Sequence, residues 1–159
     1  MTTKNSTLVE NFEASPIVMN DAHLLHGVKR VAQGTIALAA GDSTDDDVVM
    51  LAPIPSNASI TALNIASDTL GGSCTFNVGI YTTAGVVKDE DAFATDVADE
   101  AAMTDVRFEA ADINTCGQQL YELAGDTTDP KDYYYIAVTF SATGGTGGDM
   151  SFIIEYVVN

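Results

Sequence analysis

Hydrophobic and polar residues alternate along most of the chain with the two-residue period of β-strands. The alternation is clearest in residues 74–81, where one face carries Cys74, Phe76, Val78 and Ile80. Further segments fit strands by alternation or as short apolar runs, at residues 31–40, 48–52, 59–66, 133–141 and 150–158. Turn residues separate the six segments. The sequence therefore predicts an all-β, antiparallel β-sandwich of the jelly-roll type.

The last two predicted strands are joined by the glycine-rich segment SATGGTGGD, residues 141–149. Glycine adopts positive φ at little cost, so this segment suits a tight connection between neighbouring strands. We therefore predict that residues 133–141 and 150–158 form a C-terminal hairpin.

Helical patterns are few. Residues 112–124 are the best candidate, because Asp112 suits an N-cap, apolar residues recur three and four apart, and Gly125 suits the C′ position. We expect this helix to cover one end of the sandwich. Residues 88–105 are acidic and fit a second short helix or an ordered loop equally well, as a long excursion between strands.

The first thirty residues mix Ser, Asn and Thr with scattered apolar side chains. We interpret residues 1–30 as an extended N-terminal arm and residues 31–159 as the sandwich domain. Such an arm can lie along a neighbouring molecule and add a strand to an exposed sheet edge. The apolar residues of the arm that are candidates for partner contact are Phe12, Ile17, Val18, Leu24 and Leu25.

An acidic run, DSTDDD at residues 42–47, precedes the strand at 48–52. It lacks the central glycine and the distal glutamate of an EF-hand calcium loop. A looser calcium site shared with the carboxylates of residues 89–91 stays open, but a solvated turn is the interpretation that we favour. On that interpretation Pro53 and Pro55 end the strand, since neither has an N–H to donate.

Charge restricts the partners. The 159 residues contain six Lys and Arg against 23 Asp and Glu, for a formal net charge of −17. Such a surface repels phosphate backbones and anionic membranes, so we predict no nucleic-acid and no membrane partner. No apolar run reaches the ~18 residues that a membrane helix needs.

Residues suited to catalysis are sparse. His23 and His26 are three apart and could share a metal on a helix, although exposed or partner-contacting histidines are the simpler interpretation. Cys74 and Cys116 could form one disulfide, but buried free thiols are expected. The sequence lacks phosphate-loop, HExxH and GxSxG motifs. We predict no catalytic residue, no cofactor and no metal, and therefore no enzyme.

An acid-pair hydrolase is a remote alternative. Such enzymes use two carboxylates in a cleft that is usually lined with aromatic rings. The chain has no Trp, and strand alternation places Tyr134 on the opposite face from Tyr133 and Tyr135, so these rings form no stacking platform.

Several segments occur in a characteristic order over residues 34–158: VMLAPIPSNASITALNIAS, FNVGIYTTAG, DAFATDV, RFEAADI, QQLYELAG and DPKDYYYIAVTFSA. This order resembles the capsid decoration proteins, also called cement or auxiliary head proteins, of tailed bacteriophages. The resemblance implies a jelly-roll-like virion protein on the outer capsid surface, assembled in the host cytoplasm. It implies the major capsid protein as partner, bridging of neighbouring capsid subunits, and a homo-oligomer such as a trimer. No individual functional residue is carried over. The alternative is a tail- or fibre-associated module that binds a receptor or glycan.

Overall fold

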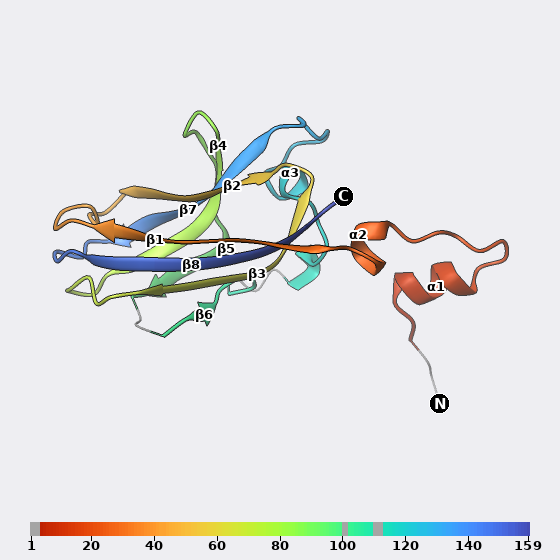
Figure 1. The fold of residues 1–159 in the computed structure, drawn as a ribbon, viewed down its shortest axis with the longest axis horizontal. Coiled ribbons are helices and arrows are strands. Elements are labelled where there is room, and N and C mark those ends of the chain that lie inside the picture. Colours follow the sequence, from red (N-terminus) through yellow and green to blue (C-terminus); the bar gives the residue numbers. More distant parts are fainter. Residues whose placement is uncertain (1–3, 100–101, 110–112) are drawn as a thin grey trace.

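The computed structural model describes residues 4–99, 102–109 and 113–159 and shows a two-layered β-sandwich with a helical segment at one end (Figure 1). The strands are β1 (Lys29–Leu38), β2 (Val48–Pro55), β3 (Ala58–Ser67), β4 (Thr75–Thr82), β5 (Val87–Ala98), β6 (Thr104–Asp105), β7 (Tyr133–Ala142) and β8 (Gly148–Val158). The short helices are α1 (Thr7–Glu13), α2 (Ala22–Leu25), a 3-10 turn η1 (Ile113–Thr115) and α3 (Leu120–Leu123).

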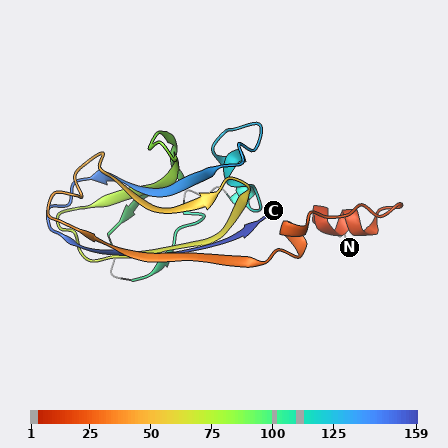
Figure 2. The same ribbon diagram turned by 45° about the horizontal axis from the view of Figure 1, so that its top comes forward.

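The strands form two antiparallel sheets with the orders β1-β8-β3-β6 and β2-β7-β4-β5. Figure 2 shows the two sheets lying face to face. Most connections cross from one sheet to the other, which is the eight-stranded jelly-roll arrangement. The predicted fold class is confirmed, and each of the six predicted strands overlaps an observed one.

The predicted C-terminal hairpin is wrong. β7 belongs to one sheet, between β2 and β4, whereas β8 belongs to the other, between β1 and β3. The glycine-rich segment between them is therefore a crossing between layers and not a hairpin turn. A local pattern of two strands and a turn does not distinguish these connections, because both need the same glycine conformations.

The excursion predicted for residues 88–105 is largely the edge strand β5, and its described residues contain no helix. Ile80 of β4 pairs with Asp89 but Val78 pairs with Ala94, so the intervening residues of β5 bulge out of register. The bulge passes directly over Gly79, where an added Cβ would lie 2.1 Å from the carbonyl oxygen of Asp89. Only glycine permits this close backbone approach.

The helix predicted for residues 112–124 is also wrong. Asp112 lies outside the described residues, and the rest of the segment is divided between η1 and α3. Gly117 separates them with a φ of +84°, a left-handed conformation that interrupts a helix. The pattern did locate the apolar anchor correctly, since Leu120 is fully buried.

Pro53 does not end β2, which continues to Pro55 and pairs Pro53 with Tyr135 and Pro55 with Tyr133. β2 is the outer strand of its sheet. A residue without an N–H is tolerated on such a strand where its nitrogen faces the open side.

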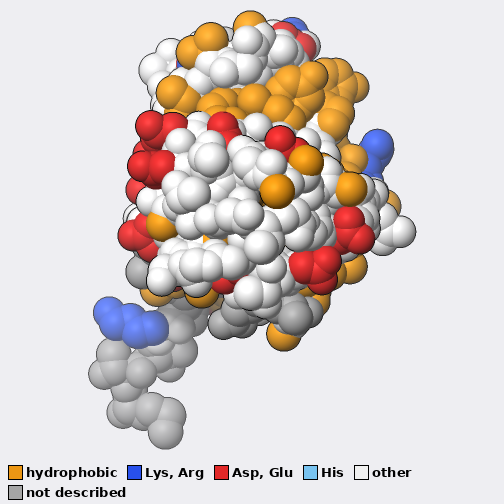
Figure 3. Space-filling model, turned by 90° about the vertical axis from the view of Figure 1, so that its left-hand side faces the viewer, with side chains coloured by type: hydrophobic (Ala, Val, Ile, Leu, Met, Phe, Trp, Pro, Cys, Tyr) orange, Lys and Arg blue, Asp and Glu red, His pale blue; other side chains and the backbone are white. Residues whose placement is uncertain are grey.

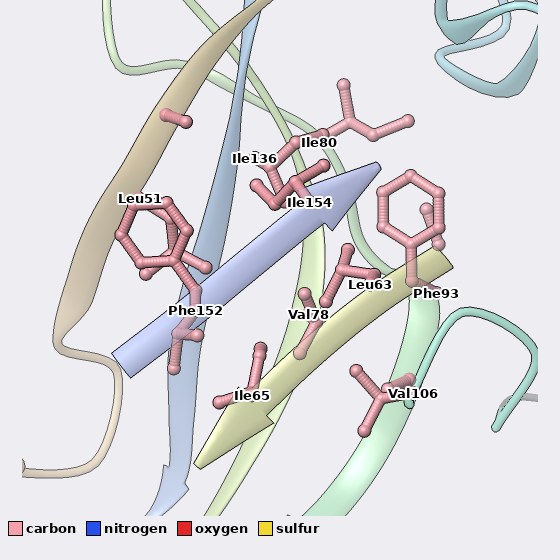
Figure 4. Packing of buried hydrophobic residues seen from close by; sticks show 14 of the residues in the cluster. Leu51, Leu63, Ile65, Val78, Ile80, Phe93, Val106, Ile136, Phe152 and Ile154 are labelled. Atoms are coloured by element: carbon pink, nitrogen blue, oxygen red, sulfur yellow. The ribbon is translucent and has the colours of Figure 1, made fainter. Parts of the chain in front are cut away.

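The core lies between the sheets. Figure 4 shows Leu63, Ile65, Phe152 and Ile154 from one sheet directed toward Val78, Ile80 and Ile136 from the other. All of these side chains are buried. The six predicted strands contribute most of this core, as the alternation of apolar residues requires.

One charged side chain lies inside the core. Arg107 is 1% exposed, and its Nε donates to the Ile60 carbonyl at 3.1 Å. Its terminal nitrogens donate to Thr115 Oγ1 at 3.3 Å, and its guanidinium lies 5.0 Å from the Phe93 ring centre and 4.4 Å from that of Phe108. The β3 strand bulges immediately after Ile60. Arg107 thus binds the bulge to the segment that carries η1.

Candidate partner-binding surface

The candidate binding residues lie in a helical segment that projects from one end of the sandwich (Figures 1 and 2). α1 and α2 lie before β1, and neither contains a buried residue. The prediction of an extended arm is therefore wrong for the residues of these two helices. We call residues 4–28 the arm from here on.

Polar side chains hold the arm in shape. Asn11 Nδ2 donates to Asn20 Oδ1 at 2.8 Å, and Asn20 Nδ2 donates to the Leu8 carbonyl at 2.9 Å. The Val18 N–H donates to the Asn11 carbonyl at 3.0 Å. These bonds fasten α1 to the segment that follows it without using apolar packing.

The apolar side chains of the arm consequently face solvent. The five predicted contact residues are all exposed, namely Phe12 (71%), Ile17 (62%), Val18 (51%), Leu24 (44%) and Leu25 (50%). Two further apolar residues of the arm that were not predicted as contacts are also exposed, Met19 (86%) and Val28 (77%). Met19 directly follows Ile17 and Val18, so the unbroken apolar run could have identified it as a contact residue. A concentration of exposed apolar groups on one projecting segment is typical of an interaction surface.

Two glycines join the arm closely to the sandwich. An added Cβ at Gly117 would lie 2.7 Å from Leu24 Cδ2, so α2 packs on the backbone there. At Gly27 an added Cβ would lie 2.4 Å from Val157 Cγ1 and 2.7 Å from the His23 carbonyl. The base of the arm is thus fixed, while α1 and the loop between the helices project.

The two histidines belong to no larger cluster of metal-ligating side chains within the described residues. Within the described residues, no three His, Cys, Asp or Glu side chains are placed to hold an ion together. The Nδ1 atom of His23 is buried, and no group of the described residues forms a hydrogen bond with it. His26 ends α2, where its N–H donates to the Ala22 carbonyl.

The acidic run at residues 42–47 forms a turn that binds its own backbone. Asp42 accepts the Ala39 N–H at 2.8 Å, and Asp47 accepts the N–H of Thr44 at 2.9 Å together with the Thr44 hydroxyl. These bonds from Thr44 lower the pKa of Asp47. Asp42 and Asp47 thus hold the backbone of the turn in place.

Perturbed carboxylates occur at a second place, where the segment after α3 meets β7. Bonds from Lys88 and Tyr134 lower the pKa of Asp126, and a bond from Ser56 lowers that of Asp129. Burial, followed by the hydrogen bond to Asp126, raises the pKa of Tyr134. Tyr134 is 4% exposed and Tyr133 is 52% exposed, so adjacent rings do point to opposite faces as predicted. The hydrogen bond from Tyr134 fastens the segment that contains Asp126 to β7.

The two cysteines are free, with Cys74 buried and Cys116 exposed. Burial, and then the negative charge of Asp99, raises the pKa of the Cys74 thiol, which makes it a poor nucleophile. The expectation of free thiols is confirmed, but Cys116 is not a core residue.

The end of the molecule opposite the arm carries both acidic and hydrophobic side chains. Figure 3 shows this end, with acidic side chains around its margin, few basic ones, and a band of hydrophobic side chains across its upper part.

The described part of the chain contains no helix that is long and apolar enough to span a membrane.

Solved structures of phage capsids contain chains with the same fold. A chain of the cyanophage Pam1 capsid asymmetric unit aligns over 100% of both chains, with a TM-score of 0.53 and 12% identity. A chain of the Ralstonia phage GP4 capsid aligns over 84% of this chain and 86% of that one, with a TM-score of 0.58 and 16% identity. No protein-family model and no curated protein matches the sequence. The predicted resemblance to phage capsid proteins is confirmed at the level of the fold.

Proposed function

We propose that the protein is a structural component of a phage virion that decorates the outer surface of the head and bridges neighbouring capsid subunits. The observation that carries this proposal is the alignment with the Pam1 capsid chain over the full length of both chains. The match is not to one domain within a longer chain. The fold therefore exists in that capsid as a chain of about this size.

The charge supports an external position. A protein with a formal charge of −17 is repelled by packaged DNA, whereas on the outer surface it adds negative charge to the particle and favours dispersion. An anionic surface facing solvent is consistent with decoration and inconsistent with lining the genome cavity.

The arm supplies the means of attachment in this proposal. Its exposed apolar side chains include Phe12, Ile17 and Met19, which are the kinds of groups that anchor protein interfaces when a partner buries them. The major capsid protein is the partner that we propose for this surface. A homo-oligomer would repeat the contact and multiply its effective strength.

Attachment to bare expanded heads tests the proposal. Deletion of residues 1–27, or replacement of Phe12, Ile17 and Met19 by Ser, should abolish co-sedimentation with the heads. The matched control replaces three exposed apolar residues outside the arm and the β1 edge, Val86, Val87 and Ile113, by Ser and should bind normally. Undiminished binding by the deletion variant would remove the arm from the mechanism. Imaging that placed the protein on a tail or fibre, or measurable glycan binding by the isolated protein, would favour the alternative module.

A further inference from the structure

The sandwich has four edge strands, and three of them carry features that block pairing with another strand. An open edge presents unpaired N–H and C=O groups that a further strand can join. β2 contains two prolines and a bulge after Met50. β5 changes register repeatedly against β4, and β6 has two residues. Proline, bulges and shortness are the usual protections of a sheet edge.

The fourth edge, β1, has none of these protections. Its ten residues pair with β8 in one unbroken register, from Lys29 with Val157 to Leu38 with Gly148. The strand contains no proline, no bulge and no acidic residue. At ~3.4 Å per residue it offers an edge of about 34 Å.

The side chains of β1 are also of the kind expected on an edge strand that another molecule covers. Val31 faces outward and is 54% exposed. The outward residues that follow it in β1 are Gln33, Thr35 and Ala37, and none of them is charged. Ile36 faces the core and is only partly buried there. It lines a groove between the open edges of β1 and β2, together with Leu38, Val48 and Met50. A strand added to β1 would cover this groove.

We propose that β1 is a self-association edge, on which β1 of a second copy pairs antiparallel across a two-fold axis. The four-stranded sheets of two copies then form one continuous sheet. This inference rests on the homo-oligomer of the proposed function and gives it a specific contact. It is tested on the isolated protein, so a negative result there is distinguishable from a failure to bind heads.

The charge pattern identifies the occupant and its direction. Lys29 and Arg30 begin β1, whereas the acidic turn at residues 42–47 follows its end. Antiparallel pairing places the basic start of each copy near the acidic turn of the other, and parallel pairing would place like charges together. Lys29 also bonds Glu155 of β8, but Arg30 makes no ion pair within the described ranges. Because the dimer has a two-fold axis, this contact between a basic start of β1 and an acidic turn occurs twice.

Sedimentation equilibrium of the full chain in 0.15 M NaCl tests the proposal. The native protein should be a dimer at about 10–100 μM, a range that ordinary non-obligate contacts populate. The double variant Val31→Lys with Gln33→Lys should be a monomer, and its Tm should equal that of the native protein at concentrations low enough for the native dimer to dissociate, since both side chains are exposed. The control Val87→Lys adds charge to a residue of similar exposure on the β5 edge and should remain a dimer.

Charge reversal tests the direction of pairing. Arg30→Glu should weaken the dimer at least tenfold, and combining it with Asp45→Lys should restore most of the affinity. A native monomer at the highest concentration would overturn the proposal. A dimer or trimer that is insensitive to the double lysine variant would also overturn it.

Discussion

The buried arginine provides the most specific test of how this sandwich is stabilised. Arg107 donates to the carbonyl at the β3 bulge and to Thr115, and it contacts two aromatic rings. The substitution Arg107→Met keeps a long side chain of similar volume, so it leaves little cavity. It removes the donors and leaves the Ile60 carbonyl buried without this partner.

The expected cost follows from these contacts. An unsatisfied buried carbonyl costs about 1–3 kcal/mol, and the lost contacts with the ring faces add about 0.5–2 kcal/mol. Removing the charge returns part of its desolvation penalty, so we expect a net loss of roughly 2–4 kcal/mol of unfolding free energy. In a chain of this size each kcal/mol lowers Tm by about 2–4 °C.

Guanidinium unfolding at a fixed protein concentration measures the change, with an unaltered m-value as evidence that the folded and unfolded states remain comparable. Arg107→Lys separates charge from geometry. Lysine keeps the charge but cannot reproduce the planar fork that reaches Ile60 and Thr115 together, so it should also destabilise. If Arg107→Met changes the unfolding free energy by less than about 0.5 kcal/mol, the assigned role of this side chain is wrong.

Three further predictions concern the backbone, the thiols and the pH dependence. Gly79→Ala should cost about 1–3 kcal/mol or more, because its Cβ meets the backbone of β5, whereas Gly34→Ala meets only the tip of the Phe152 ring at 3.0 Å and should cost less in the same unfolding assay. A thiol reagent should modify Cys116 rapidly in the folded protein and Cys74 only after unfolding, and equal rates would contradict the assigned burial. Lowering the pH from 7 toward 5 should raise Tm, because protonation reduces the repulsion of a chain with a formal charge of −17. Below about pH 4 Tm should fall, since the carboxylates whose folded pKa lies below the unfolded value lose their contribution as the pH falls through the folded pKa; these are Asp47, Asp126 and Asp129. A Tm that decreases steadily from pH 7 to 5 would contradict the repulsion argument.

Strand positions were predictable because burial on one face imposes a two-residue period. Residues 74–81 were assigned to within one residue at each end, and β4 is Thr75–Thr82. Sheet membership was not predictable in the same way. β7 and β8 looked like a hairpin because the pattern records which residues are apolar but not which sheet each strand joins.

The other errors have local causes that tertiary contacts override. β5 carries four carboxylates in residues 87–98 and fitted a short helix or a loop, yet Phe93 anchors it in the core at 0% exposure. The three- and four-residue spacing at 112–124 indicated a helix, but Gly117 takes a left-handed conformation within it. Arg107 gave no signal, since a single arginine in sequence is normally an exposed residue.

The arm was found by composition but not by conformation. Its apolar residues were identified because they have no period that would bury them in the sandwich. Its helices were missed because α1 and α2 have seven and four residues, too short to show a clear periodicity. The bonds of Asn11 and Asn20 that shape it join residues nine and twelve positions apart, which a search for caps and turns does not detect.

The pairing of Lys29 with Val157 has a practical consequence for display. It places the start of β1 and the end of β8 at one pole of the molecule, beside the arm (Figure 1). A peptide fused after β8 would thus lie close to the arm, which is the proposed site of attachment. If the proposed contacts hold, an insertion at Gly85, in the turn between β4 and β5 where no atom lies within 4 Å of an added Cβ, would avoid both the arm and the β1 edge.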